Sequence, residues 1–157
     1  MNSINSNQKE VDHTDLMGGE AIEKIRFLID KSSGSCFFCN SNLMNFNYST
    51  PISVLKSESN GDLWFVSPKD SFKNMEITQD FEVTLVFSGA SHSEFLELEG
   101  NVMICDEKNR IKELWKPMVK SWLKDGLDDP RISINQFKPE KGYYWDNTEG
   151  NIVELNF

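Results

Sequence analysis

The sequence is short of the residues that build disulfides, metal sites and membrane spans. Only three of its 157 residues are cysteine and two are histidine, and so small and odd a number of cysteines does not make a disulfide framework. No apolar run approaches the roughly 20 residues that span a bilayer. The start of the chain also lacks the basic and apolar segments of a signal peptide. We therefore expect a cytoplasmic protein with free thiols and no membrane contact.

Positive charge is scarce as well. The chain has 16 basic against 25 acidic residues and a formal net charge of -9, and no tract rich in Lys or Arg offsets this charge locally. An acidic surface field repels phosphate backbones. Nucleic acid is therefore not an expected partner.

The motifs of metal sites and nucleophilic enzymes are missing too. Cys36 and Cys39 have the spacing of a zinc or redox pair, but they sit in an apolar run typical of a strand, where residues three apart point to opposite faces. His13 lies in a polar tail and His92 in a Ser/Gly turn, so neither is placed to complete a metal site or to act as a positioned base. We assign no metal site and no catalytic residue.

The length and composition of the chain predict one domain. Residues 1–15 are rich in Asn, Ser and Asp with hardly an apolar residue, so we expect them to form a disordered tail. The rest, 16–157, is long enough for a single domain with its own core. From Glu20 onward apolar residues recur at helical spacing, and the Ser-Ser-Gly run at 32–34 stops this first helix.

Short extended segments follow the first helix. In chain order they read SCFFC, YSTPISVL, DLWFV, EVTLVF, EFLELEGNVMIC, ISINQFKP, GYYWDN and NIVELNF. Asn60-Gly61, just before the third of them, is the strongest short hairpin signal, and a brief helical patch is predicted at 71–78. Because no strand-helix-strand pattern repeats, the predicted fold class is α+β, built on a small antiparallel barrel.

A second helix is predicted to start at Asp106, which would cap it, and Pro117 is expected to kink or split it. This helix brings Trp115 and Trp122, seven residues apart, onto one face. Two tryptophans on one stripe suit an ordinary core, a dimer interface or a wall against a flat ring. The residues alone leave these alternatives open.

The stretch SPKDSFK, residues 67–73, is the main candidate site. It lies where the strand DLWFV ends and a short helix is expected to begin. Unpaired helix amides, two hydroxyls and two ammonium groups would converge there on an anion such as a phosphomonoester. The alternative is a polar turn with Asp70 as the helix cap, which gives no reason for both lysines.

Three motifs together resemble the general-stress-protein branch of the pyridoxamine phosphate oxidase-like, flavin-binding split barrels. They are the phosphate-loop pattern of SPKDSFK, the segment ELWKPMVKSW with its tryptophan spacing, and the closing YYWDN. The resemblance covers nearly everything after the tail.

The resemblance implies a six-stranded antiparallel split β-barrel with flanking helices that forms a homodimer. It further implies one FMN in each of two clefts at the subunit interface. The residues that match the family's FMN-binding positions are Ser67, Lys69, Ser71 and Lys73 for the phosphate, Thr50, Pro51, Ile52 and Ser53 beside the ring, and Trp115 and Trp122 from the partner subunit.

One position departs from the family pattern. Where the family commonly has Arg-Pro-Met, this chain reads Thr50-Pro51-Ile52, so a flavin-contacting arginine is absent. Loss of such a charge-assisted contact weakens binding by about tenfold to a hundredfold. The resemblance therefore implies either an FMN-dependent oxidoreductase of unknown substrate or a non-enzymatic flavin carrier. A third possibility is a dimer whose degenerate cleft no longer holds FMN tightly.

Overall fold

The computed structural model describes residues 16–32, 34–40, 48–69, 82–89, 94–105, 107–115, 125, 128–146 and 151–156. The predicted tail and the predicted helical patch at 71–78 lie outside these residues. The elements are β1 (Leu16–Met17), α1 (Gly18–Lys31), β2 (Ser35–Asn40), β3 (Tyr48–Ser57), β4 (Leu63–Pro68), β5 (Glu82–Ser88), β6 (Glu94–Cys105), α3 (Lys108–Leu114), β7 (Ile132–Asp146) and β8 (Asn151–Asn156).

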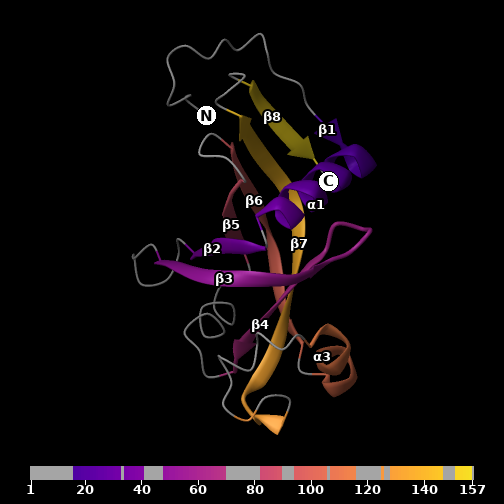
Figure 1. The fold of residues 1–157 in the computed structure, drawn as a ribbon, viewed down its shortest axis with the longest axis vertical. Helices are drawn as coiled ribbons and strands as arrows, with labels where there is room; N and C mark the ends of the chain where they lie inside the picture. Colours follow the sequence, from indigo (N-terminus) through magenta and orange to yellow (C-terminus); the bar gives the residue numbers. More distant parts are fainter. Residues whose placement is uncertain are drawn as a thin grey trace.

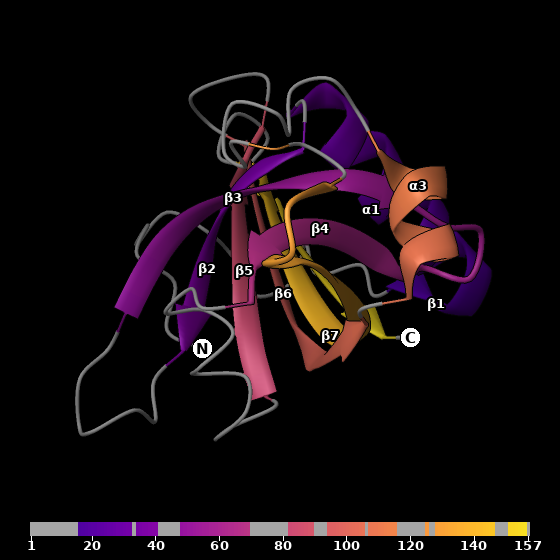
Figure 2. The same cartoon turned by 90° about the horizontal axis from the view of Figure 1, so that it is seen from below.

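Six strands close into an antiparallel barrel. Their order is β7-β4-β3-β2-β5-β6, and β6 pairs again with β7 to complete the wall. Figure 2 shows these strands curving around a common interior. β8 pairs with the far half of β7, and β1 adds a parallel partner to β8. The predicted α+β class and its six-stranded antiparallel barrel with flanking helices are confirmed.

The barrel interior and α1 share one hydrophobic core. Inward side chains of β2 to β7, such as Phe38, Phe65 and Phe137, form a single cluster with the apolar face of α1. The buried residues of that face are Ala21, Ile25, Leu28 and Ile29. Their spacing of three and four residues is the helical periodicity from which this helix was predicted. α1 therefore belongs to the core, and it lies across the strands in Figure 1.

α3 covers a different surface, the outside of β4 and β7. Ile111 and Leu114 of α3 pack with Trp64 of β4 and with Ile132 and Ile134 of β7 in a second cluster. Figure 2 shows α3 outside the barrel wall. Neither helix of the described chain is long and apolar enough to cross a lipid bilayer.

The start of α3 differs from the prediction. Glu107, not Asp106, is the N-cap, and its side chain makes no capping hydrogen bond. β6 stays paired with β7 up to Cys105, so the chain leaves the sheet too late for the helix to begin directly after Asp106. At the other end the helix stops at Leu114, because Pro117 lacks an N–H and would clash with a helical carbonyl four residues back.

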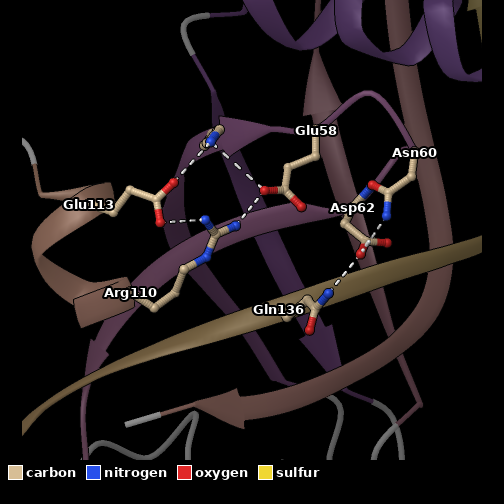
Figure 3. Close-up of polar contacts among 7 residues, drawn as sticks. Glu58, Asn60, Asp62, Arg110, Glu113 and Gln136 are labelled. Atoms are coloured by element: carbon tan, nitrogen blue, oxygen red, sulfur yellow. Dashed lines mark hydrogen bonds and ion pairs between the residues drawn. The ribbon is translucent and has the colours of Figure 1, made fainter. Parts of the chain in front are cut away.

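The hairpin between β3 and β4 turns at the predicted Asn60-Gly61. Gly61 has φ 96°, in the left-handed region that favours glycine. Its N–H donates to the Glu58 carbonyl over 3.0 Å, and the Asp62 N–H donates to Asn60 Oδ1 over 3.0 Å. Gln136 of β7 donates to Asp62 Oδ2 over 2.6 Å and ties the turn to the sheet (Figure 3).

Candidate functional site

A hollow of about 600 Å³ opens on the outside of the barrel wall. It spans β3, β2, β5 and the start of β6. Its lining residues are Ser35, Cys36, Phe37, Pro51, Ile52, Ser53, Val86, Ser88 and Phe95. Pockets of this volume are typical of small-molecule and cofactor sites.

Strand pairing explains why these side chains share one face. Phe37 is opposite Pro51 on one side and Val86 on the other, and directly opposed residues of antiparallel strands point the same way. Cys36 and Phe38, the neighbours of Phe37 on β2, are buried in the core. Phe37 therefore points outward and is 53% exposed, and Phe95 is 38% exposed. The hollow carries more exposed aromatic surface than a solvated barrel wall requires.

Three of the four predicted residues on β3 line this hollow. Pro51, Ile52 and Ser53 are among its lining residues. Thr50 is opposite Phe38 on the inward side of the wall and is half-buried, and it does not line the hollow. The backbone at 51–53 thus borders an open, largely apolar space.

Two of the four residues predicted to bind the phosphate, Ser67 and Lys69, lie in β4 and directly after it. Val54 pairs with Phe65 in antiparallel register. Lys69 comes four residues after Phe65, and Thr50 comes four residues before Val54. The β3–β4 pairing ends at Val54 and Phe65, and Lys69 is exposed just beyond the end of β4. Ser71 and Lys73 lie outside the described residues.

Ser67 sits inside the barrel end rather than on its surface. It is 2% exposed, and its Oγ accepts a hydrogen bond of 2.7 Å from Asn135 Nδ2. The Ser133 hydroxyl donates to the Ser67 carbonyl over 2.9 Å. Two residues on, the Lys69 N–H donates to the Arg131 carbonyl over 2.5 Å. Hydrogen bonds from β7 and from Arg131, the residue before it, therefore hold residues 67–69 at the end of β4.

Trp115 does not border the hollow of its own chain. It is the C-cap of α3 and packs, half-buried, against the outer cluster under that helix. That cluster covers β4 and β7, whereas the hollow lies over β2, β3 and β5. The predicted role of Trp115 therefore requires a second subunit. Trp122 lies outside the described residues.

A charged network fastens α3 to the β3–β4 hairpin. Arg110 pairs with Glu58 and with Glu113, the latter at 2.9 Å, and its guanidinium lies 4.3 Å from the ring centre of Trp64. Lys56 Nζ is 3.8 Å from each of the two carboxylates. Figure 3 shows Glu58, Arg110 and Glu113 converging between the helix and the hairpin. Burial alone would raise the pKa of Glu58, but the Arg110 hydrogen bond and the nearby positive charges hold it below its usual value.

Two further titratable groups lie near the hollow. Burial, and secondarily the neighbouring Cys39, raises the pKa of the Cys36 thiol to about 12, so this thiol stays protonated. None of the three cysteines forms a disulfide, as predicted. Glu97, opposite Val86 on β6, has a raised pKa because of burial first and the charge of Glu99 second.

Sequence reasoning missed six of the nine residues that line the hollow. They are Ser35, Cys36, Phe37, Val86, Ser88 and Phe95. Ser133 and Asn135, which contact Ser67, were not predicted as site residues either. The signal for Phe37 was present, because strand alternation puts Phe37 and Phe38 on opposite faces. No local pattern indicated that β5 would pair with β2 and that β6 would follow on the far side of β5.

Three solved structures are similar to this fold. A protein related to general stress protein 26, of the pyridoxinephosphate oxidase family, from Clostridium acetobutylicum, has a TM-score of 0.75 at 16% identity and covers 87% of this chain and 94% of its own. General stress protein 26 from Bacillus anthracis has a TM-score of 0.69 at 19% identity, covering 80% and 93%. The general stress FMN/FAD binding protein from Xanthomonas citri has a TM-score of 0.68 at 20% identity, covering 80% and 89%.

The sequence itself identifies the family. No curated protein sequence matches this chain. The family model described as pyridoxamine 5'-phosphate oxidase like, however, matches residues 20–156. This range takes in α3, every strand of the barrel and all of α1 except its first two residues. The chain therefore belongs to the pyridoxamine 5'-phosphate oxidase-like family.

Proposed function

We propose that this protein is a homodimer that binds one FMN in each of two clefts at its subunit interface and uses it in an oxidoreductase reaction of unidentified substrate. The observation that carries the proposal is the hollow of about 600 Å³ bordered by β3 residues 51–53 and exposed phenyl rings. A flat, amphipathic ring suits such a surface. The FMN/FAD binding relative from Xanthomonas citri, which shares the fold, supports a flavin as the ligand.

Each set of residues has a part in this proposal. The backbone at Pro51, Ile52 and Ser53 would meet the polar edge of the ring. Ser67, Lys69, Ser71 and Lys73 would hold the phosphate at the end of β4. Trp115 and Trp122 would close the cleft of the partner subunit. Bound flavin supplies the hydride or electron chemistry, so this chain needs to position and shield it rather than to furnish a catalytic residue.

One observation favours a second function, a non-enzymatic flavin carrier. Thr50 stands where the family commonly has arginine and lies on the inward side of the wall. It therefore supplies no charge to the hollow. A cleft that binds flavin more weakly would suit transient carriage, or would be a degenerate remnant of the flavin site.

We further propose that the protein works in the cytoplasm. Its three cysteines form no disulfide, and one of them lies in the barrel core, which fits a reducing compartment. The net charge of -9 argues against nucleic acid and against anionic membrane surfaces as partners.

The visible absorption spectrum of the purified protein, taken before and after incubation with FMN and removal of the excess, tests the proposal. Retained flavin bands support it, and a protein that stays colourless contradicts it. Addition of NADH or NADPH then separates the two functions. If NADH or NADPH reduces the bound flavin, the protein is an oxidoreductase. If the bound flavin stays oxidised with both donors, the carrier function is favoured.

Removing the two loop lysines tests the phosphate assignment. In the double variant Lys69→Ala/Lys73→Ala, FMN affinity should fall by at least about tenfold, because two charge-assisted contacts are lost. Riboflavin lacks the phosphate, so its affinity should change less than about twofold. Isothermal titration of both ligands measures this. Lys24→Ala/Lys31→Ala on α1 is the control for net charge, and equal weakening of FMN in both variants would refute the assignment.

A further inference from the structure

A second hollow, of about 400 Å³, lies between α1 and β3. Its lining residues are Arg26, Ile29 and Asp30 of α1, Gly34 of the turn before β2, and residues 54–57 of β3. It shares no lining residue with the hollow that we assign to flavin. Its volume lies within the range of small-molecule sites.

The Arg26 guanidinium is the unusual group in this hollow. Arg26 is half-buried, and its Nε is buried without a hydrogen-bond partner. Buried polar side-chain atoms are nearly always hydrogen-bonded, and burial of a cationic donor without an acceptor is unfavourable. Among the described residues Arg26 has no ion-pair partner either. The Nε therefore indicates an acceptor that none of the described residues supplies.

Asp30 places the opposite charge in the same hollow. It lies one helical turn after Arg26 and is exposed. Opposite charges four residues apart on a helix are neighbours that commonly pair, but the ion pairs of the described residues include neither Arg26 nor Asp30. Lys56, the other cation of the lining, lies 3.8 Å from Glu58 and from Glu113 and belongs to the α3 network. The hollow thus presents one cation and one anion, each open to a third group.

The wall opposite α1 is rigid and polar. A Cβ on Gly34 would lie 2.5 Å from the Val54 carbonyl oxygen, so the two backbones are in direct contact. The Gly34 N–H donates to the Ile29 carbonyl over 3.0 Å, and the Val54 N–H donates to the Gly34 carbonyl over 2.8 Å. The β3–β4 register then shifts and leaves Leu55 as a bulge, where backbone groups fall out of the ladder. This backbone and Ser57 offer neutral hydrogen-bonding groups beside the two charges.

We propose that this hollow binds a small zwitterion, an α-amino acid with a polar side chain. Its carboxylate would pair with Arg26 and its ammonium group with Asp30, both through charge-assisted hydrogen bonds. A simple anion would be repelled by Asp30, and a simple cation would be repelled by Arg26. The polar wall suits a polar side chain. The inference does not depend on flavin binding, since the two hollows have different lining residues.

Isothermal titration with L-glutamine tests this site. Two analogues each lack one of its charges: glutaramate has no ammonium group, and γ-aminobutyramide has no carboxylate. L-Glutamine should bind, and each analogue should bind at least about tenfold more weakly, because it loses one charge-assisted contact. If L-glutamine does not bind, or if either analogue binds as tightly, the inference is overturned.

Variants on α1 show whether the two charges are responsible. Arg26→Gln and Asp30→Asn should each weaken L-glutamine at least about tenfold. Lys31→Gln and Glu23→Gln are the matched controls, because they remove the same charges from exposed positions of α1 outside the lining. The controls should change the affinity less than about twofold, and equal weakening in variants and controls would refute the site. If Arg26→Gln does not fold, Asp30→Asn at its exposed position still decides.

Amide chemical shifts then locate the ligand. Addition of L-glutamine should shift the amides of Gly34 and Leu55 in the wild-type protein, and the same addition to Asp30→Asn should not. Shifts confined to other residues would place the ligand elsewhere and overturn the inference. FMN affinity, measured in the same variants, should stay unchanged, so failure of the flavin proposal leaves this test intact.

Discussion

At Gly100 the backbones of β6 and β7 lie too close for a side chain. The pairing of the two strands shifts between Glu99 and Gly100, so that Gly100 is opposite Pro139 and Glu140 is left over as a bulge. A Cβ built on Gly100 would lie 2.1 Å from the Lys138 carbonyl oxygen. The bulge accommodates Pro139 in β7. Beyond it, from Lys141 onward, β7 also pairs with β8.

Gly100→Ala should therefore destabilise the protein by about 2 kcal/mol or more, because backbone atoms would have to move. For a domain of this size the thermal midpoint should fall by roughly 4–8 °C, measurable by calorimetry. Gly19→Ala is the control. Nothing lies within 4 Å of its Cβ position, and alanine in a helix should stabilise by about 0.5–1 kcal/mol. Equal midpoints for the two variants would contradict this account of the bulge.

At the scale of elements, the attachment of α3 depends on one arginine and its carboxylates. α3 is only seven residues long, too short to be stable by itself. Its two buried residues pack on β4 and β7, and Arg110 lies over Trp64 and pairs with Glu58 of the hairpin. Because Trp115 is the C-cap of α3, this network also fixes the position of the first tryptophan of the predicted Trp115–Trp122 pair.

Glu58→Gln should lower stability at neutral pH by about 1 kcal/mol. Since the folded-state pKa of Glu58 is lowered, its contribution is present above the unfolded pKa of about 4.3 and is lost as pH falls through the lower folded value. Urea unfolding at several pH values should show the variant and wild type converging below about pH 4. Glu113→Gln, which alters the more exposed carboxylate, should lower the free energy of unfolding by less than Glu58→Gln does. If the difference in unfolding free energy between Glu58→Gln and wild type is the same at every pH, the ion pair is not its cause.

At the scale of the whole molecule, the outer face of β2, β3, β5 and β6 is the surface available for a second subunit. Phe37 and Phe95 are exposed there beside the hollow. Trp115 lies over a different part of the wall, so within one chain it cannot cover that hollow. A homodimer would bury the two phenyl rings and bring the helix of one subunit to the hollow of the other, which is the arrangement we propose.

Phe37→Asp should disrupt this dimer, because a carboxylate would be buried in an apolar interface. Sedimentation velocity should show the variant as a monomer, and retained FMN should fall with it. Phe27→Asp on α1 is a matched control, since Phe27 is 52% exposed against 53% for Phe37 but lies against Lys31, away from the hollow. Equal sedimentation of the two variants would show that Phe37 is not at the interface.

The sequence by itself determined the elements and the kind of fold. α1, the Asn60-Gly61 turn and the long strand at 94–105 were predicted from local patterns, because helical spacing, turn residues and strand alternation act within a few residues. The free thiols followed from the number of cysteines. Three short motifs resembled the family, and the family model over residues 20–156 confirms it.

Only the tertiary structure decided which face each residue occupies and which distant residues meet. In ISINQF, alternation suggests isoleucines inside and polar residues outside. The structure has the reverse, because α3 covers the outside of β7 and buries Ile132 and Ile134 there, while Ser133 and Asn135 point inward to Ser67. The hollow likewise exists only because β2 pairs with β5, which in turn pairs with β6. Burial depends on what packs against a strand, and that is not encoded within the strand itself.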